Sequence, residues 1–237
     1  MTPTHPSRRP PRRRSRTSAR ALALAAGLVL GGLTAPATAA APSCLGEAAT
    51  IVGTDKADVL RGTAGRDVIW LGAGADRVSA GGGDDTVCGG AGDDVLDGGD
   101  GRDVIVGEGG NDRIRTGDGT NDEGNGGPGH DTISSEGDGS LLIGGAGRDV
   151  LAGGGRGDLL DGGAGHDTIS ALVGDAEVTG GPGNDEITVH RQPAAWLRGD
   201  AGDDVIRTGA GNDGTSSQPI DGGDGNDTIR TGGGTDL

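Results

Sequence analysis

The stretch Gly89-Gly-Ala-Gly-Asp-Asp-Val-Leu-Asp97 is followed at once by Gly98-Gly-Asp-Gly-Arg-Asp-Val-Ile-Val106, and the two segments align residue for residue. An earlier segment, Gly62-Thr-Ala-Gly-Arg-Asp-Val-Ile-Trp70, has the same outline. The repeating unit therefore has nine residues, Gly-Gly-x-Gly-x-Asp-x-U-x, in which U is an aliphatic side chain. A fixed period of this kind indicates a repeat architecture rather than an ordinary globule.

The same unit covers most of the chain. Turns can be laid end to end over residues 53–237, with insertions near Glu123 and within 189–198 and 208–221. This gives about twenty turns, the last of them truncated.

Each part of the unit predicts a local structure. Glycine reaches positive φ without strain, so the first six positions suit a tight loop with exposed backbone carbonyls. The x-U-x part predicts a short strand that is buried on one face. Two loops and two strands make one coil of about eighteen residues. The predicted fold is therefore all-β, a right-handed parallel β-roll of about twenty nine-residue turns that stack as about ten coils.

Composition and charge restrict the partners. Glycine accounts for 54 of the 237 residues, while Phe and Tyr are absent, so the large rings that usually dominate a core are missing. The formal charge is −16, and it becomes −23 when the seven arginines that precede residue 40 are left out. Such a surplus repels nucleic acid and anionic lipid and favours cations as partners.

The first residues predict export. Residues 1–41 have a basic start through Arg20, an apolar run from Ala21 to Leu33, and small residues at Ala37-Thr-Ala39 that suit cleavage. The apolar run is too short for a membrane span. We therefore expect a removed signal peptide and a secreted, extracellular product, with both the general and the twin-arginine export route open.

Two further features follow the signal segment. Residues 42–52 predict an N-terminal capping segment, because Ile51 is in phase with the U positions and repeat stacks need caps. Cys44 and Cys88 are the only cysteines. Outside the cytosol such a pair is usually a disulfide, and the alternative interpretation is two unrelated small residues.

With about a dozen close copies in register, the unit Gly-Gly-x-Gly-x-Asp-x-U-x resembles the repeat of the RTX, or haemolysin-type, calcium-binding family. The resemblance covers residues 53–237. Within that family, the chain is similar to the small stand-alone repeat proteins of high-GC Gram-positive bacteria. It implies that Ca²⁺ ions lie between the loops of successive coils, with the sixth position supplying carboxylates and the glycine-rich loop supplying carbonyls. Ca²⁺ takes six to eight oxygen ligands of both kinds.

The resemblance also implies a set of metal ligands, one for each sixth position that holds aspartate. These residues are Asp58, Asp67, Asp76, Asp85, Asp94, Asp103, Asp112, Asp131, Asp149, Asp158, Asp167, Asp185, Asp204, Asp213 and Asp227.

The sixth positions differ between the two loop edges. Odd-numbered turns carry aspartate without a gap, from Asp58 to Asp227. Even-numbered turns have Ser140, Ala176 and Ala194 at three of these positions, and Asp122 falls one place late. We therefore expect a continuous ladder of up to nine sites on the odd edge, whereas the even edge should bind well only near the N-terminus and, as a second region, near the end of the chain.

Catalytic motifs such as His-Glu-x-x-His and Gly-x-Ser-x-Gly do not occur in the sequence. We expect a non-enzymatic protein whose folding is coupled to Ca²⁺ binding and which acts as a structural or surface-interaction module, with an unknown cell-surface or matrix partner. The alternatives are an extracellular adhesin and an ice-binding solenoid, although Thr86, Thr132, Thr168 and Thr228 are scattered rather than aligned.

Overall fold

The computed structural model describes residues 41–173, 175–190, 196–210 and 220–232. The predicted signal peptide, residues 1–41, lies almost wholly outside this part. The described residues form one compact unit, and the elements within it are all β-strands. Within the described residues, no helix is long and apolar enough to cross a membrane.

The repeat region and the strand before it form two parallel sheets of ten strands each. The first sheet contains β3 (Ile51–Val52), β5 (Val68–Ala73), β7 (Thr86–Ala91), β9 (Val104–Gly109), β11 (Glu123–Pro128), β13 (Leu141–Ala146), β15 (Leu159–Ala164), β17 (Glu177–Pro182), β19 (Trp196–Ala201) and β21 (Ile220–Asp221). The second contains β4 (Val59–Arg61), β6 (Arg77–Gly82), β8 (Val95–Asp100), β10 (Arg113–Arg115), β12 (Thr132–Ser135), β14 (Val150–Gly153), β16 (Thr168–Ala171), β18 (Glu186–Val189), β20 (Val205–Thr208) and β22 (Thr228–Arg230).

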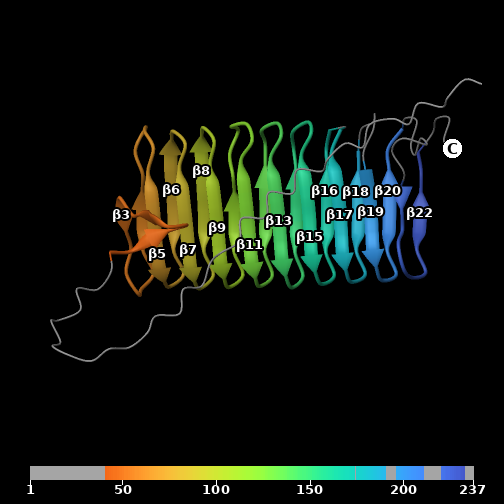
Figure 1. Ribbon diagram of the computed structural model, residues 1–237, viewed down its shortest axis with the longest axis horizontal. Coiled ribbons are helices and arrows are strands. Elements are labelled where there is room, and N and C mark those ends of the chain that lie inside the picture. Colours follow the sequence, from red (N-terminus) through yellow and green to blue (C-terminus); the bar gives the residue numbers. More distant parts are fainter. Residues whose placement is uncertain (1–40, 174, 191–195, 211–219, 233–237) are drawn as a thin grey trace, which may run out of the picture. The chain divides into compact units, whose positions relative to one another are not determined.

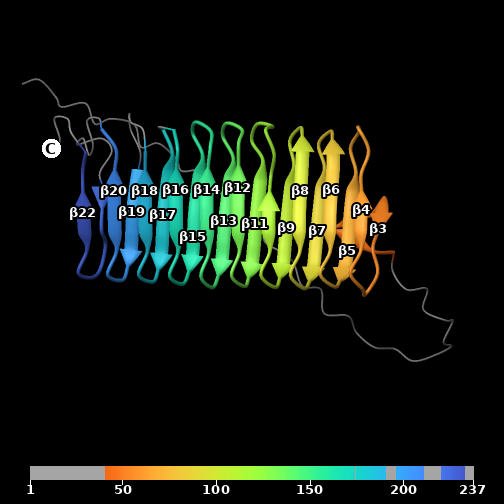
Figure 2. The same cartoon turned by 180° about the vertical axis from the view of Figure 1, so that it is seen from behind.

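The chain alternates between the two sheets, so each strand pairs with the second strand before and after it in sequence (Figure 1). Ile69 lies opposite Val87 in the first sheet, and Val78 lies opposite Leu96 in the second, a spacing of eighteen residues in both cases. The view from behind follows the same order from β3 to β22 (Figure 2). The all-β class and the parallel solenoid are thus confirmed.

The core is a column of aliphatic side chains between the sheets. The U residues face inward from both sheets, and those from Ile69 to Ile206 are buried. Leu60 and Ile220 are partly buried and pack against this column, while Ile229 in β22 is 43% exposed. Most strands contribute one such aliphatic residue, while β11 has Gly124 at the inward position, where the side chains of Ile133 and Leu142 lie next to it.

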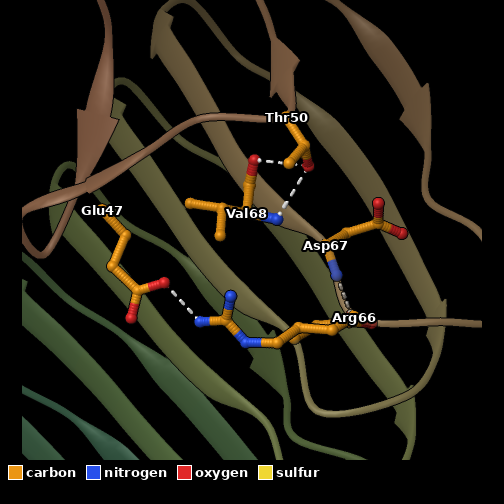
Figure 3. Close-up of polar contacts among 6 residues, drawn as sticks. Glu47, Thr50, Arg66, Asp67 and Val68 are labelled. Atoms are coloured by element: carbon orange, nitrogen blue, oxygen red, sulfur yellow. Dashed lines mark hydrogen bonds and ion pairs between the residues drawn. The ribbon is translucent and has the colours of Figure 1, made fainter.

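The N-terminal segment attaches to the first coils in two ways. Its strand β3 extends the first sheet, with Ile51 opposite Ile69. Thr50 is hydrogen-bonded to the next coil: its hydroxyl donates to the carbonyl of Val68 (3.1 Å) and accepts the Val68 N–H (2.9 Å), as Figure 3 shows. An ion pair between Glu47 and Arg66 joins the same two coils (Figure 3).

The remainder of this segment is an antiparallel hairpin of β1 (Ser43–Cys44) and β2 (Glu47–Ala48). Cys44 is buried and forms the predicted disulfide with Cys88 in β7. Val68 and Trp70 pack around the bridge, so this hairpin covers the outer face of the first sheet. Strand β3, rather than the hairpin, continues the core at the end of the roll.

We expect the double substitution C44S/C88S to lower the free energy of unfolding of the calcium-saturated protein by about 2–4 kcal/mol, because the bridge closes a long loop. Denaturant unfolding followed by far-UV circular dichroism measures this change. The single substitution E47Q, which removes only an exposed ion pair, is the control and should have little effect. An unchanged midpoint in the double variant would contradict this account of the cap.

Candidate metal-binding edges

The aspartates at the sixth position form two rows, one along each loop edge of the roll. Each of these residues directly precedes a strand, so the strand register fixes its height. The row that we call the long row is Asp58, Asp76, Asp94, Asp112, Asp131, Asp149, Asp167, Asp185, Asp204 and Asp227. The row that we call the short row is Asp67, Asp85, Asp103 and Asp122.

One oxygen of each carboxylate connects neighbouring coils. The backbone N–H of Asp94 donates to Oδ1 of Asp112 (2.8 Å), and that of Asp112 donates to Oδ1 of Asp131 (2.7 Å). The same bond links every neighbouring pair of the long row, ending with Asp204 and Asp227 (3.0 Å). It also links the members of the short row. Each aspartate after the first of its row thus accepts a hydrogen bond from the preceding coil.

The second carboxylate oxygen has no such partner. Within the described residues, twelve buried side-chain oxygen or nitrogen atoms lack a hydrogen bond, and all but the Thr116 hydroxyl are Oδ2 atoms of these rows. The eleven aspartates are Asp76, Asp85, Asp94, Asp103, Asp112, Asp122, Asp131, Asp149, Asp167, Asp185 and Asp204. Burying an ionised oxygen without a partner is costly, so this pattern points to a ligand that is positively charged.

Glycine at the first loop position makes room beside this oxygen. A Cβ atom on Gly107 would lie 2.2 Å from Oδ2 of Asp112 and 2.7 Å from the carbonyl oxygen of Gly126 in the next coil. A side chain at this position would therefore fill the space around the carboxylate. Gly89, Gly144, Gly162, Gly180 and Gly199 have the same relation to the aspartates of their own loops.

Glycines at the second and fourth loop positions allow the loops to stack closely. Gly90 and Gly92 have φ values of 103° and 130°, and a Cβ atom on either would lie within 2 Å of a carbonyl oxygen of the preceding coil. Among the described residues, the carbonyls of Gly74, Gly92 and Gly110 accept no backbone hydrogen bond. The loops thus bring columns of free carbonyl oxygens to the same edge as the carboxylates.

These donors fit a calcium ion. Ca²⁺ accepts carboxylates and backbone carbonyls together in a flexible geometry with six to eight oxygens. No group of three or more His, Cys, Asp or Glu side chains that could hold a metal occurs within the described residues. A site between two coils would therefore take one or two carboxylates and draw its other oxygens from the loop backbone, a donor set that differs from the sulfur and nitrogen ligands typical of zinc.

Burial changes the acidity of the rows. It raises the pKa of Asp103 and Asp112 to about 7, mainly because these carboxylates are removed from water; the N–H bond from the preceding coil lowers the pKa, and neighbouring carboxylates raise it. Asp94, Asp131, Asp167 and Asp185 have pKa values raised to about 6 for the same reasons. Without a cation, these carboxylates repel one another and favour protonation.

The N-terminal members of the two rows differ from the others. Oδ2 of Asp58 accepts bonds from the N–H (2.7 Å) and hydroxyl (2.8 Å) of Thr54. Oδ2 of Asp67 accepts the equivalent bonds from Thr63, at 2.7 and 3.0 Å. At the other end of the long row, Asp227 is only partly buried. These positions belong to the rows, but their carboxylates are not left without partners in the way that Asp112 is.

The edge that carries the short row, formed by the even-numbered turns, partly departs from the sequence-based expectation. Asp122 is not displaced from the row, because the loop before it holds one extra residue and its Oδ1 still accepts the N–H of Asp103 (3.0 Å). Ser140 and Ala176 interrupt the row as expected, and Oδ2 of Asp158 accepts the N–H of Gly155 (3.0 Å). Asp213 and Ala194 lie outside the described residues.

A second ladder was not predicted from the sequence. Side chains at the fifth loop position on the long-row edge accept backbone N–H groups from the next coil. Asp93 accepts the N–H of Asn111 (2.7 Å), Asn111 that of His130 (2.9 Å), and Nδ1 of His130 that of Arg148 (2.8 Å). The recurrence of Asp, Asn and His at this position was the available signal, because all three side chains can accept a hydrogen bond.

Comparison with known families gives one match. The family model of the RTX calcium-binding nonapeptide repeat matches residues 52–87, 89–122, 125–155, 143–178, 195–214 and 220–237. No curated protein matches the chain.

The raised pKa values predict that acid and calcium act in the same direction on folding. Protons bind more tightly to the folded, metal-free rows than to the unfolded chain, so folded-state stability is greatest below the ordinary aspartate pKa and falls as the pH rises through 6 to 7. We expect the metal-stripped protein to gain β-structure when the pH is lowered from about 8 to about 5. Far-UV circular dichroism without added calcium measures this, and a pH-independent spectrum would contradict it.

Proposed function

Since the chain belongs to the RTX calcium-binding nonapeptide repeat family, we propose that it is a secreted calcium-binding protein whose folding is coupled to Ca²⁺ and whose folded roll is a non-catalytic structural or surface-interaction module. The ligands are the aspartates of the two rows, together with carbonyls of the glycine loops. Ca²⁺ is its inorganic partner, and the acidic charge disfavours nucleic acid as a partner.

The observation that carries this proposal is the set of eleven buried Oδ2 atoms without hydrogen-bond partners. Each ionised carboxylate would cost several kcal/mol to bury alone, and the rows place such groups one coil apart. A divalent cation between coils offsets both the lost hydration and the mutual repulsion. Because the unfolded chain holds no preformed site, binding free energy then contributes directly to folding.

Export is supported by the N-terminal segment and by the disulfide. Residues 1–41 are proposed as a signal peptide that is removed, and residues 42–52 as the cap that the mature chain keeps. The Cys44–Cys88 bridge is typical of proteins that fold outside the cytosol. Extracellular calcium modules usually bind in the range of about 10⁻⁴ to 10⁻³ M, so the sites would be filled in an extracellular medium.

The outer faces favour a surface-interaction module over an ice-binding solenoid. An ice-binding face would need threonines repeated in one column. Thr132, Thr168 and Thr228 do share one column of the second sheet, but Val150, Glu186 and Val205 stand between them. One interruption between Thr132 and Thr168, and two consecutive ones between Thr168 and Thr228, break the regular hydroxyl array. An adhesive role is the second candidate function.

The first test is a titration of the metal-stripped protein with Ca²⁺ at pH 8, followed by far-UV circular dichroism. We expect a transition from a coil spectrum to a β spectrum that chelator reverses. Mg²⁺ at the same concentration should not produce it, because Mg²⁺ demands a smaller and more regular octahedral site. A spectrum that is already β-rich in chelator at this pH would contradict the proposal that folding is coupled to calcium binding.

The second test compares two substitutions of aspartate by asparagine. D112N keeps the acceptor of the Asp94 N–H but removes a charge from the long row, so bound Ca²⁺ should fall by about one or two ions per chain. D100N changes an exposed aspartate and should leave the stoichiometry unaltered. Equilibrium dialysis with metal analysis measures both, and equal values for D112N and the parent protein would remove Asp112 from the ligand set.

A further inference from the structure

We propose that calcium loads the two loop edges unequally: along the long row from Asp76 to Asp204, but on the described part of the opposite edge only among Asp85, Asp103 and Asp122, beyond which the protein's own groups take the place of the ions. This inference rests on the proposed function and concerns how its sites are distributed. It predicts about two ions per coil in the N-terminal coils and one per coil further on.

A pair of hydroxyl groups replaces the first missing site. Ser140 stands at the sixth position and Ser135 at the first position of the same loop, and both are buried. Their Oγ atoms share a hydrogen bond of 2.8 Å, and each lies within 3.4 Å of the carbonyl oxygen of Gly137. The backbone N–H of Ser140 still donates to Asp158 (2.9 Å), so the register is kept. Every group that would face an ion here already has a partner within the loop.

Asp158 has a carboxylate at the sixth position, but both of its oxygens accept hydrogen bonds from the protein. Its Oδ1 accepts the N–H of Ser140, and its Oδ2 accepts the N–H of Gly155 at 3.0 Å. Its loop also differs, because glycine with positive φ stands at the fifth position (Gly157, 71°) instead of at the second and fourth. Asp103 on the same edge has the same Oδ1 bond but an Oδ2 without a partner in the described residues. The two aspartates therefore differ in the oxygen that would bind a cation.

The next coils close this edge with apolar side chains. Ala171 and Ala176 occupy the first and sixth positions of one loop, and Val189 occupies the first position of the next. All three are buried and belong to the hydrophobic core cluster. A methyl or isopropyl group at these places supplies no oxygen and fills the volume that a carboxylate and its ion would need. An apolar environment of this kind cannot replace the hydration of a divalent cation, so it does not favour a calcium site.

The opposite edge of the same coils shows no such change. From Asp131 to Asp204 the hydrogen-bond ladder continues, and the Oδ2 atoms of Asp131, Asp149, Asp167, Asp185 and Asp204 have no partner in the described residues. The loss of sites is therefore confined to one edge and does not reflect a general weakening of the repeat toward the C-terminal coils.

The test uses Asp103 and Asp158 as a matched pair. D103N and D158N remove the same charge from the same edge, and both keep the Oδ1 acceptor. Bound Ca²⁺ per chain is measured by equilibrium dialysis at saturating calcium, with circular dichroism as a check on folding. We expect D103N to lose about one or two ions and D158N to retain the full parental number. A loss in D158N equal to that in D103N would overturn the inference.

A second measurement keeps the inference testable if D158N does not fold. Anomalous difference maps of the calcium-loaded parent protein should place calcium peaks along the long row and, on the described part of the other edge, only near Asp85, Asp103 and Asp122. A peak beside Ser140, Asp158 or Ala176 would contradict unequal loading. Failure of the proposed function has a different signature, because the parent protein would then bind no calcium and show no peaks on either edge.

Discussion

The contact on which this structure depends is the one between an aspartate and the coil before it. Oδ1 of Asp112 accepts the backbone N–H of Asp94, and this places Oδ2 of Asp112 in a buried position between two glycine loops. The same side chain therefore sets the alignment of neighbouring coils and places a negative charge between them. The hydrogen bond aligns the coils, while the second oxygen makes the aligned state electrostatically unfavourable unless a cation is present. In the proposed function, stacking and cation binding are for this reason a single event.

Most of the fold could be predicted because the repeat imposes one structural solution on nearly every turn. The spacing of Ile69, Val87 and Ile105 predicts the inward column, and the glycine pattern predicts the loops. The disulfide could be expected from the two cysteines of a chain whose first residues predict export. The sheet contacts of the capping hairpin could not, since Val68 and Trp70 stand at positions that face solvent in most other turns.

The edges were predicted less completely, because a motif specifies residue types but not the bonds that satisfy them. Counting residues placed Asp122 outside its row, whereas the loop before it absorbs the extra residue and leaves the strand register intact. Counting also treated Asp158 as equal to Asp103. The Oδ2 atom of Asp158 accepts the N–H of Gly155, whereas the Oδ2 atom of Asp103 has no partner among the described residues. Local hydrogen bonds of this kind depend on loop conformation, and a nine-residue pattern does not encode it.

The pairing of strands over eighteen residues has a consequence for how such a chain can change in length. Deleting or duplicating eighteen residues removes or adds one whole coil, and every downstream residue keeps its sheet and its edge. A change of nine residues instead transfers all downstream turns to the opposite side, so that the gapless series of aspartates would continue on the edge that Ala171, Ala176 and Val189 now seal. The unit by which this fold can lengthen or shorten without disturbing its edges is therefore the coil, twice the unit that its sequence displays.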